Sequence, residues 1–246
     1  MLSADLRSAL DPVHFCGERL QLALDPWQCA LLRRRGLREL VNVTRQGGKS
    51  TCTAAAVLHE CCFVPGSKTI VISPSQRQSD LLLERVKELA ERARLPVRPL
   101  GGEGSGLTAP SGTFVALPAS EATTRGFSGC TWLIVDEAAR VPDALFHSSR
   151  AYLATTNGRT WLLSTPFGRR GFFHREHESG RWRITKIPAV ECPRISPEFL
   201  AEQQLSLPAA WFRQEYECEF TSVEDGLFDH DLVLQAVTSE VEPLCL

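Results

Sequence analysis

Residues 41–51 read Val41-Asn42-Val43-Thr44-Arg45-Gln46-Gly47-Gly48-Lys49-Ser50-Thr51. The apolar start predicts a short buried strand, and the residues from Ser50 to Cys62 have the composition of a helix. A loop that joins a strand to a helix directs backbone N–H groups and the positive end of the helix dipole at one point, where an anion binds favourably. The two glycines allow close backbone approach, because they carry no Cβ atom. The pattern predicts a phosphate-binding loop.

The side chains of this loop suit a nucleoside triphosphate. Lys49 would reach the β- and γ-phosphates as a point charge, and the Ser50 hydroxyl would bind Mg²⁺. The usual pattern starts with a Gly six residues before the Lys, but Val43 stands there. The loop alone therefore leaves a nucleotide site and a chance match as open alternatives. The other loop residues that we expect at the nucleotide are Gln46, Gly47, Gly48 and Thr51.

A second segment supplies two carboxylates. It reads Trp132-Leu133-Ile134-Val135-Asp136-Glu137 and fits a buried strand of a parallel sheet, whose carboxyl edge is where ligands bind. Asp136 would hold Mg²⁺ through water, and Glu137 would polarise the attacking water. The alternative is that both acids cap a helix beginning near Pro142 or are solvated at a strand end. The phosphate-binding loop upstream favours the catalytic interpretation.

The rest of the chain alternates between strand and helix patterns. An amphipathic helix is expected from Ser75 to about Ala93, and a flexible loop from Gly101 to Gly112. Buried strands that alternate with helices predict an α/β fold with a mainly parallel sheet flanked by helices. We expect a nucleotide-binding core over residues 1–190 and a small helical appendage over residues 191–246. The other expected strands are 69–73, 113–117, 160–164 and 182–187, and the other expected helices are 24–35, 197–206 and 208–217.

Composition limits the function classes. The chain has 246 residues, a net charge of −2 and nine cysteines without a Cys-x-x-Cys pair. It contains no apolar run that could span a membrane and no secretory leader pattern, so we expect an intracellular enzyme with reduced core cysteines. A generally basic nucleic-acid surface is absent, so DNA would have to bind a local patch. Arg169-Arg170 is one candidate, and a solvated turn is the alternative.

Three further segments have a functional and a structural interpretation. The Gln28 amide has a donor and an acceptor that match adenine, although a surface helix residue would look the same. Arg125 lies in a Gly-flanked loop and could reach a γ-phosphate in its own subunit or in a neighbour, or it could be solvated. Ser164 and Thr165 end a strand and could sense the γ-phosphate, or they could be ordinary capping residues.

Together, these motifs resemble the ATPase half of a large terminase subunit, the motor that packages viral DNA into tailed-bacteriophage procapsids. The resemblance runs from about Leu24 to Phe228. The Val at the first loop position and the Arg-Gln within the loop, which depart from the general pattern, are typical of that family. The motifs that carry it are Pro26-Trp27-Gln28, Thr44-Arg45-Gln46-Gly47-Gly48-Lys49-Ser50, Arg125-Gly126, Leu133-Ile134-Val135-Asp136-Glu137-Ala138, Ser164-Thr165-Pro166 and Phe212-Arg213-Gln214-Glu215-Tyr216-Glu217-Cys218-Glu219-Phe220.

The resemblance implies a RecA-like fold of the ASCE type and an ATPase that uses Mg²⁺. It implies that a ring of subunits acts on the capsid portal with a small terminase subunit and translocates double-stranded DNA, in the host cytoplasm and transiently on the procapsid. An isolated subunit would be a monomer. By position, Gln28 resembles the adenine-reading residue, and Ser164-Thr165 resembles the coupling motif. Arg45 and Arg125 are both positions for a charge-stabilising arginine, and Arg125 acting across the ring is favoured.

Two other classes compete with this interpretation. A helicase-like DNA-dependent ATPase shares these motifs, but it normally uses two RecA-like domains. A nucleotide-binding assembly protein would not need Glu137. Large terminases usually continue into a nuclease domain, and Asp229 and Asp231 alone cannot build a two-metal site. We therefore expect no nuclease activity from this chain. Either the chain is an excised fragment or the nuclease lies on another polypeptide, and the residues after 190 would lead towards that absent domain.

Overall fold

The strands of the protein form one mixed sheet in a computed structural model that describes residues 4–100, 105–120 and 127–221. The strand order in the described residues is β3-β4-β5-β2-β6-β7-β1-β8. All neighbouring pairs from β5 to β8 in this order are parallel, and β3 and β4 add an antiparallel edge. The strand bounds are β1 Arg38–Val43, β2 Ser67–Ser73, β3 Arg98–Pro99, β4 Ser105–Thr108, β5 Gly112–Pro118, β6 Trp132–Asp136, β7 Arg159–Ser164 and β8 Arg183–Ile187.

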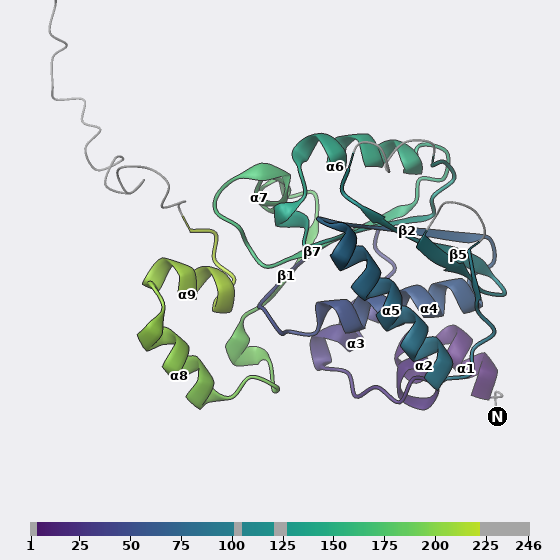
Figure 1. Cartoon of the computed structure of the whole chain (residues 1–246), viewed down its shortest axis with the longest axis horizontal. Helices are drawn as coiled ribbons and strands as arrows, with labels where there is room; N and C mark the ends of the chain where they lie inside the picture. Colours follow the sequence, from purple (N-terminus) through teal and green to yellow (C-terminus); the bar gives the residue numbers. More distant parts are fainter. Residues whose placement is uncertain (1–3, 101–104, 121–126, 222–246) are drawn as a thin grey trace, which may run out of the picture.

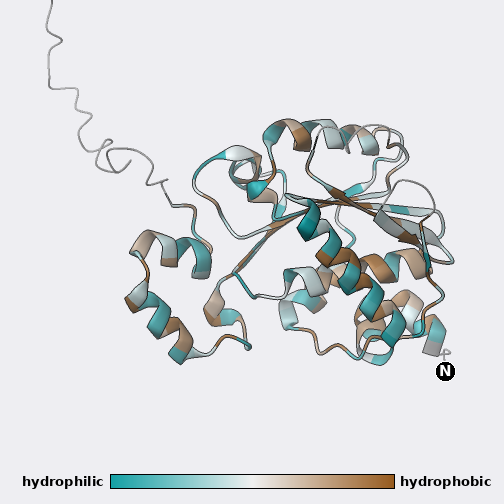
Figure 2. Ribbon diagram, viewed as in Figure 1, coloured by the Kyte–Doolittle hydropathy of each residue, from teal (hydrophilic) through white to brown (hydrophobic). Residues whose placement is uncertain are grey.

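Helices cover both faces of the sheet. Figure 1 shows α1 to α5 on one face and α6 and α7 on the other. The central strands are hydrophobic along their length (Figure 2), because neighbouring residues enter opposite cores. Val71 packs with the first group of helices, whereas Ile70 and Ile72 pack with the second. The bounds are α1 Ala4–Leu10, α2 Pro12–Glu18, α3 Pro26–Arg33, α4 Lys49–Phe63, α5 Gln76–Arg92, α6 Asp143–Ser149 and α7 Gly171–Glu178.

Two more helices, α8 (Pro197–Ser206) and α9 (Ala209–Tyr216), lie beside the sheet beyond β1 (Figure 1). No residue of α8 is buried. The end of α9 is fixed to β1, since the Asn42 side-chain amide donates to the Cys218 carbonyl at 2.9 Å. These helices therefore reach the same strand end from which the phosphate-binding loop leaves. The predicted domain boundary at residue 190 falls within a short 3-10 turn (Ala189–Glu191) and stays a prediction.

The α/β prediction is confirmed, with every expected strand present and the core helices within a few residues of their expected ends. The Ser75 hydroxyl caps α5 by accepting from the Gln78 N–H. The eight described cysteines are free, and six of them are buried. In the described part of the chain, no helix is long and hydrophobic enough to traverse a bilayer.

One expectation is wrong. The Gly/Ser-rich segment from Gly101 to Gly112 is not a loop throughout, because residues 105–108 form β4 and pair antiparallel with β5. Gly106 permits this pairing, since a Cβ atom there would collide with the Phe114 carbonyl. A glycine inside a strand marks close backbone approach as readily as it marks a loop.

Candidate nucleotide-binding site

The phosphate-binding loop occupies the turn between the end of β1 at Val43 and the start of α4 at Lys49. Its backbone conformation requires glycine at positions 47 and 48. Gly48 has φ of 89°, and a Cβ atom on it would lie 2.6 Å from the Gln28 amide nitrogen. A Cβ atom on Gly47 would collide with the Val43 side chain and lie 3.0 Å from the Thr44 carbonyl oxygen. The loop is therefore wound closely enough to exclude larger residues at both positions.

Lys49 is buried and points back into its own loop. Its ammonium group donates to the carbonyls of Val43 at 3.1 Å and Thr44 at 3.2 Å, and to the Thr165 hydroxyl at 3.2 Å. It also lies 3.7 Å from a carboxylate oxygen of Glu137. Phosphate oxygens would have to replace some of these partners for Lys49 to bind a nucleotide.

Strand β7 lies between β1 and β6 and brings the predicted residues to one edge of the sheet. Asn42 is paired with Ser164, and Leu163 with Asp136, so the three strands end at the same level. The Ser164 hydroxyl donates to Glu137 at 3.4 Å and accepts from the Ala139 N–H at 3.2 Å.

Thr165 connects the end of β7 to the phosphate-binding loop, because its hydroxyl donates to the Val43 carbonyl at 3.3 Å. Ser164 and Thr165 thus link Glu137 to the phosphate-binding loop.

Glu137 adopts a backbone conformation that is uncommon for a residue with a side chain. Its φ of 48° and ψ of 45° lie in the left-handed region. Such a residue costs on the order of 1–3 kcal/mol and is retained where the surroundings require it. The turn directs the Glu137 side chain toward Lys49 and Ser164, whereas Asp136 stays at the end of the strand.

Asp136 is suited to a cation that arrives with the nucleotide. It is buried, and its Oδ1 atom finds no hydrogen-bond donor among the described residues. Burial and the Glu137 charge raise the pKa of Asp136 to about 6, and the Lys49 charge opposes this. Together with the exposed Ser50 hydroxyl, this carboxylate provides the hard oxygen ligands that Mg²⁺ prefers. The described residues hold no cluster of three or more His, Cys, Asp or Glu that could bind a metal without nucleotide.

Asp136→Asn should stabilise the nucleotide-free protein in a pH-dependent manner. Between pH 3.8 and about 6 the folded state holds a proton on Asp136 that the unfolded chain has lost. The buried Asp136 charge therefore lowers the free energy of unfolding of the wild-type protein increasingly as pH rises through this range, and the loss is complete above about pH 6. At pH 8 the variant should gain up to about 3 kcal/mol in free energy of unfolding, and much less near pH 4.5. Denaturant titrations with a metal chelator measure both values. An equal gain at both pH values would contradict this origin.

Gln28 lies against the loop, but its amide is already hydrogen-bonded. Its oxygen accepts from the Asp25 N–H at 2.9 Å and its nitrogen donates to the Gly48 carbonyl at 3.1 Å. Arg194, for which no role was predicted from the sequence, joins this group. It donates to Asp25 at 2.8 Å and to the Gly47 carbonyl at 2.9 Å. No local pattern pointed to Arg194, because it lies 147 residues from the loop it contacts.

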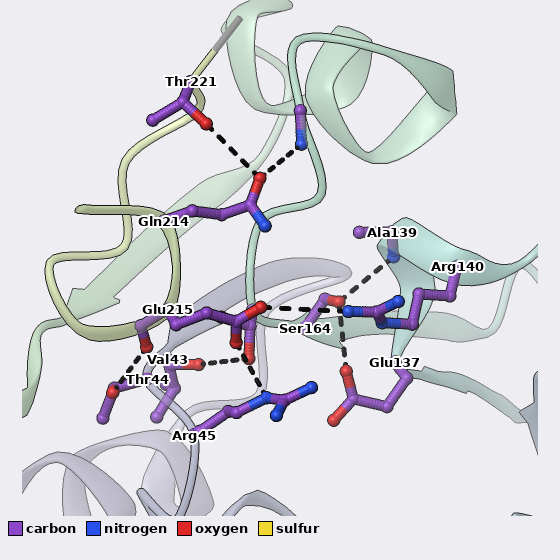
Figure 3. Close-up of polar contacts among 12 residues, drawn as sticks. Val43, Thr44, Arg45, Glu137, Ala139, Arg140, Ser164, Gln214, Glu215 and Thr221 are labelled. Carbon is purple, nitrogen blue, oxygen red and sulfur yellow. Dashed lines mark hydrogen bonds and ion pairs between the residues drawn. The ribbon is translucent and has the colours of Figure 1, made fainter. Parts of the chain in front are cut away.

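Arg45 leaves the loop toward α9 (Figure 3). Its Nε atom lies 2.8 Å from the buried carboxylate of Glu215, and Arg140 lies 3.9 Å from the other oxygen of that carboxylate. The Thr44 hydroxyl donates to the Glu215 main-chain carbonyl at 2.8 Å. Glu215 belongs to the last resemblance motif, but no role was predicted for it from the sequence. In the described conformation the Arg45 side chain is paired with Glu215.

Three other arginines were predicted to bind a ligand, Arg125 the γ-phosphate and Arg169 and Arg170 the DNA. Arg125 lies outside the described residues, so its role stays a prediction. Arg169 is hydrogen-bonded to the Phe220 carbonyl at 3.0 Å, and the Arg170 guanidinium lies 4.4 Å from the Phe167 ring centroid. Both side chains thus have contacts within the chain, and their DNA-binding role also stays a prediction.

A cavity of about 490 Å³ opens over the loop. Arg45 to Thr51, Glu137, Arg194 and Ile195 line it. A smaller cavity of about 240 Å³ lies at the opposite edge of the sheet, near Arg38 and Gly158, where the parallel strands begin. The larger one coincides with the loop and Glu137, and its volume accommodates a triphosphate.

The fold and this loop define a RecA-like P-loop domain. The family described as the terminase large subunit, T4likevirus-type, N-terminal, matches residues 41–235. The chain therefore belongs to the terminase large subunit family.

The chain is also similar to individual proteins of this kind. It is 26% identical to the large subunit of the terminase of Thermus virus P23-45 over 82% of this chain and 49% of that protein. The ATPase domain of the Thermus phage P74-26 large terminase superposes with a TM-score of 0.72 at 23% identity, covering 86% of this chain and all of that domain. The large terminase of bacteriophage HK97 gives 0.67 at 17%, covering 89% of this chain and 55% of that one. The chain thus spans about half the length of the curated relatives it matches.

Proposed function

We propose that this chain is the ATP-hydrolysing motor domain that powers translocation of double-stranded viral DNA into a procapsid. The observation that carries the proposal is the meeting of Lys49, Glu137 and the Ser164-Thr165 pair at one edge of the sheet. The large terminase of a thermophilic bacteriophage, which shares this fold, was solved in complex with ADP, and this supports a nucleotide site here.

Each residue has a defined task in this proposal. Lys49 and the loop N–H groups bind and orient the β- and γ-phosphates. Ser50 and Asp136 hold Mg²⁺, which neutralises the charge that develops on the phosphates when it is bound. Glu137 accepts a proton from the attacking water.

Ser164 and Thr165 supply the mechanical connection. They contact Glu137 on one side and Lys49 on the other, so loss of the γ-phosphate would alter both contacts. Movement of Lys49 can in this way be transmitted to β7 and to the chain that follows it.

The partners are proposed on the basis of family membership. We propose that the subunit forms a ring at the capsid portal with the small terminase subunit, in the host cytoplasm and on the procapsid, and is a monomer in isolation. Double-stranded DNA should raise the rate of Mg²⁺-dependent phosphate release. Strand separation by this chain would instead favour the helicase-like alternative, and ATP binding without turnover would favour an assembly protein.

Arg125→Ala should abolish the rise in specific activity that accompanies assembly, while changing nucleotide affinity little. A charge-stabilising arginine supplied by a neighbour is worth about 10³–10⁵-fold in rate, so the dilute monomer should be a slow enzyme. Phosphate release measured over a range of protein concentrations tests this. Arg77→Ala, on the exposed start of α5, is the matched control.

Mixing two inactive variants shows in which subunit Arg125 acts. Arg125→Ala and Glu137→Gln lack different halves of a shared site, so a mixed ring would rebuild intact sites at some interfaces. Recovery of activity is the expected result. If co-assembled mixtures stay inactive, Arg125 does not act across the ring, and Arg45 becomes the better candidate.

A further inference from the structure

Helix α9 buries one charged side chain. Its buried residues are Phe212 and Glu215, and Glu215 exposes only 5% of its surface. A carboxylate is seldom buried this far unless cations pair with it. Figure 3 shows the Glu215 side chain between Arg45 of the phosphate-binding loop and Arg140 of the turn that follows Glu137. The partners of this carboxylate therefore belong to the two segments that form the nucleotide site.

Two guanidinium groups face this one carboxylate. The Arg45 Nε atom lies 2.8 Å from Glu215 Oε2, and a terminal nitrogen of Arg140 lies 3.9 Å from Glu215 Oε1. Arg140 is also held by the Phe167 ring, whose centroid is 4.3 Å from the guanidinium carbon. Two positive charges share one negative charge, so the cluster keeps a net positive charge that favours an anion beside it.

Arg45 is held at its inner nitrogen and remains accessible. Its side chain is 62% exposed, and it lines the cavity over the loop together with Lys49 and Glu137. The nitrogen that lies against Glu215 is Nε, and Figure 3 shows the two outer nitrogens directed away from that carboxylate. The outer part of the guanidinium can therefore bind a phosphate while Glu215 holds the inner part.

The main chain of Glu215 joins α9 to the loop without help from the carboxylate. Its carbonyl accepts from the Thr44 hydroxyl at 2.8 Å and from the Arg45 N–H at 3.3 Å. Both bonds would remain if another residue stood at position 215. The carboxylate is thus not needed to attach the helix, and its contact with Arg45 sets the direction of that side chain.

We propose that Glu215 is a positioning residue that orients the Arg45 guanidinium toward the bound triphosphate. The inference rests on the proposed function, since it assumes that the loop binds the phosphates. A long arginine side chain loses rotamer freedom when it binds a ligand, and a partner that orders it beforehand reduces this cost. Glu215 acts here within one subunit, whereas the role proposed for Arg125 is across the ring.

The contact between Glu215 and Arg45 is ionic. In the described part of the chain, Glu215 Oε2 accepts no hydrogen bond of good geometry, although Arg45 Nε is 2.8 Å away. Attraction between opposite charges does not require alignment, whereas a hydrogen bond to a neutral amide does. Glu215→Gln should therefore release Arg45 while it conserves the size of the side chain.

Single-turnover hydrolysis of ATP with Mg²⁺ measures the effect of this release. Glu215→Gln should slow the reaction by about 10–100-fold, because misplacing a group by about 1 Å can cost as much as 10²-fold in rate. The matched control is Glu202→Gln, which changes an exposed carboxylate of α8 and should react at the wild-type rate. Thermal unfolding of both variants checks that they are folded.

A double-mutant cycle separates positioning from a structural role. Arg45→Ala leaves no guanidinium for Glu215 to orient, so adding Glu215→Gln to that variant should slow hydrolysis no further. A carboxylate that only stabilised α9 would slow hydrolysis by the same factor with and without Arg45.

A wild-type rate in folded Glu215→Gln would overturn the proposal, and so would equal slowing in both backgrounds. A faster rate would also overturn it, since Glu215 would then hold Arg45 away from the phosphates. These outcomes leave the proposed function intact, because they require that the wild-type chain hydrolyses ATP. If it does not, the proposed function fails and this inference with it.

Discussion

Lys49→Ala should eliminate measurable ATP hydrolysis and weaken nucleotide binding. Lys49 is the buried cation of the loop, and it lies within 3.7 Å of Glu137. Removing one group that stabilises charge in a transition state typically costs about 10²–10³-fold in rate, and here the ground-state phosphate contact is lost as well. Phosphate release and ATP titration measure the two effects.

A matched variant separates this effect from a general loss of lysine charge. Lys87→Ala changes an exposed lysine on α5, remote from the loop, and should behave as wild type. Thermal unfolding of both variants checks that they are folded. If folded Lys49→Ala retains most of its turnover, this loop is not the phosphate site.

Glu137→Gln should slow hydrolysis by about 10²–10⁴-fold and leave ATP binding nearly intact. General-base assistance is typically worth this factor, and an amide cannot accept the proton. The substitution conserves the side chain's shape and its hydrogen-bonding distance to the Ser164 hydroxyl. Single-turnover hydrolysis of pre-bound ATP isolates the chemical step.

The control for this variant is Glu84→Gln, which changes an exposed carboxylate on α5. It should leave the single-turnover rate unchanged. A nearly normal rate in Glu137→Gln would mean that another group activates the water, and the roles assigned to Asp136 and Glu137 would then be wrong.

The central sheet was predictable because its strands are buried on both faces. A continuous apolar run such as 133–135 is typical of that environment, and each run is followed by turn residues. The N-terminal helices α1 and α2 and the edge strands β3 and β4 were not predicted. They are short, so their own composition carries little signal. The helices α1 and α2 also pack on the distant helix α4, whereas β3 and β4 pair with the strands that follow them through a glycine-containing segment.

The site was predictable where its residues lie within a local motif. Asp136 ends a strand, Glu137 follows it directly and Lys49 follows the loop after another strand, and the topology of a parallel sheet brings such positions together. Arg194 and Glu215 could not be assigned in this way. Their roles arise from tertiary contacts to Gly47 and Arg45, across more than a hundred residues of sequence.

Gln28, which was predicted to bind adenine, shows the same limit of sequence-based prediction. The sequence shows that the Gln28 amide has a suitable donor and acceptor, but not that Asp25 and Gly48 already bond both. Hydrogen-bonding capacity is a property of a residue type, whereas its availability depends on the folded surroundings.

Phosphate release from ATP by the purified wild-type chain, compared with Lys49→Ala, tests the central claim most directly. The measurement is made with Mg²⁺ over a range of protein concentrations, with and without double-stranded DNA. The proposed function predicts a Mg²⁺-dependent rate above the Lys49→Ala background, with a specific activity that rises with concentration and with DNA. A wild-type rate equal to that background under every condition, in protein that binds ATP, would contradict it.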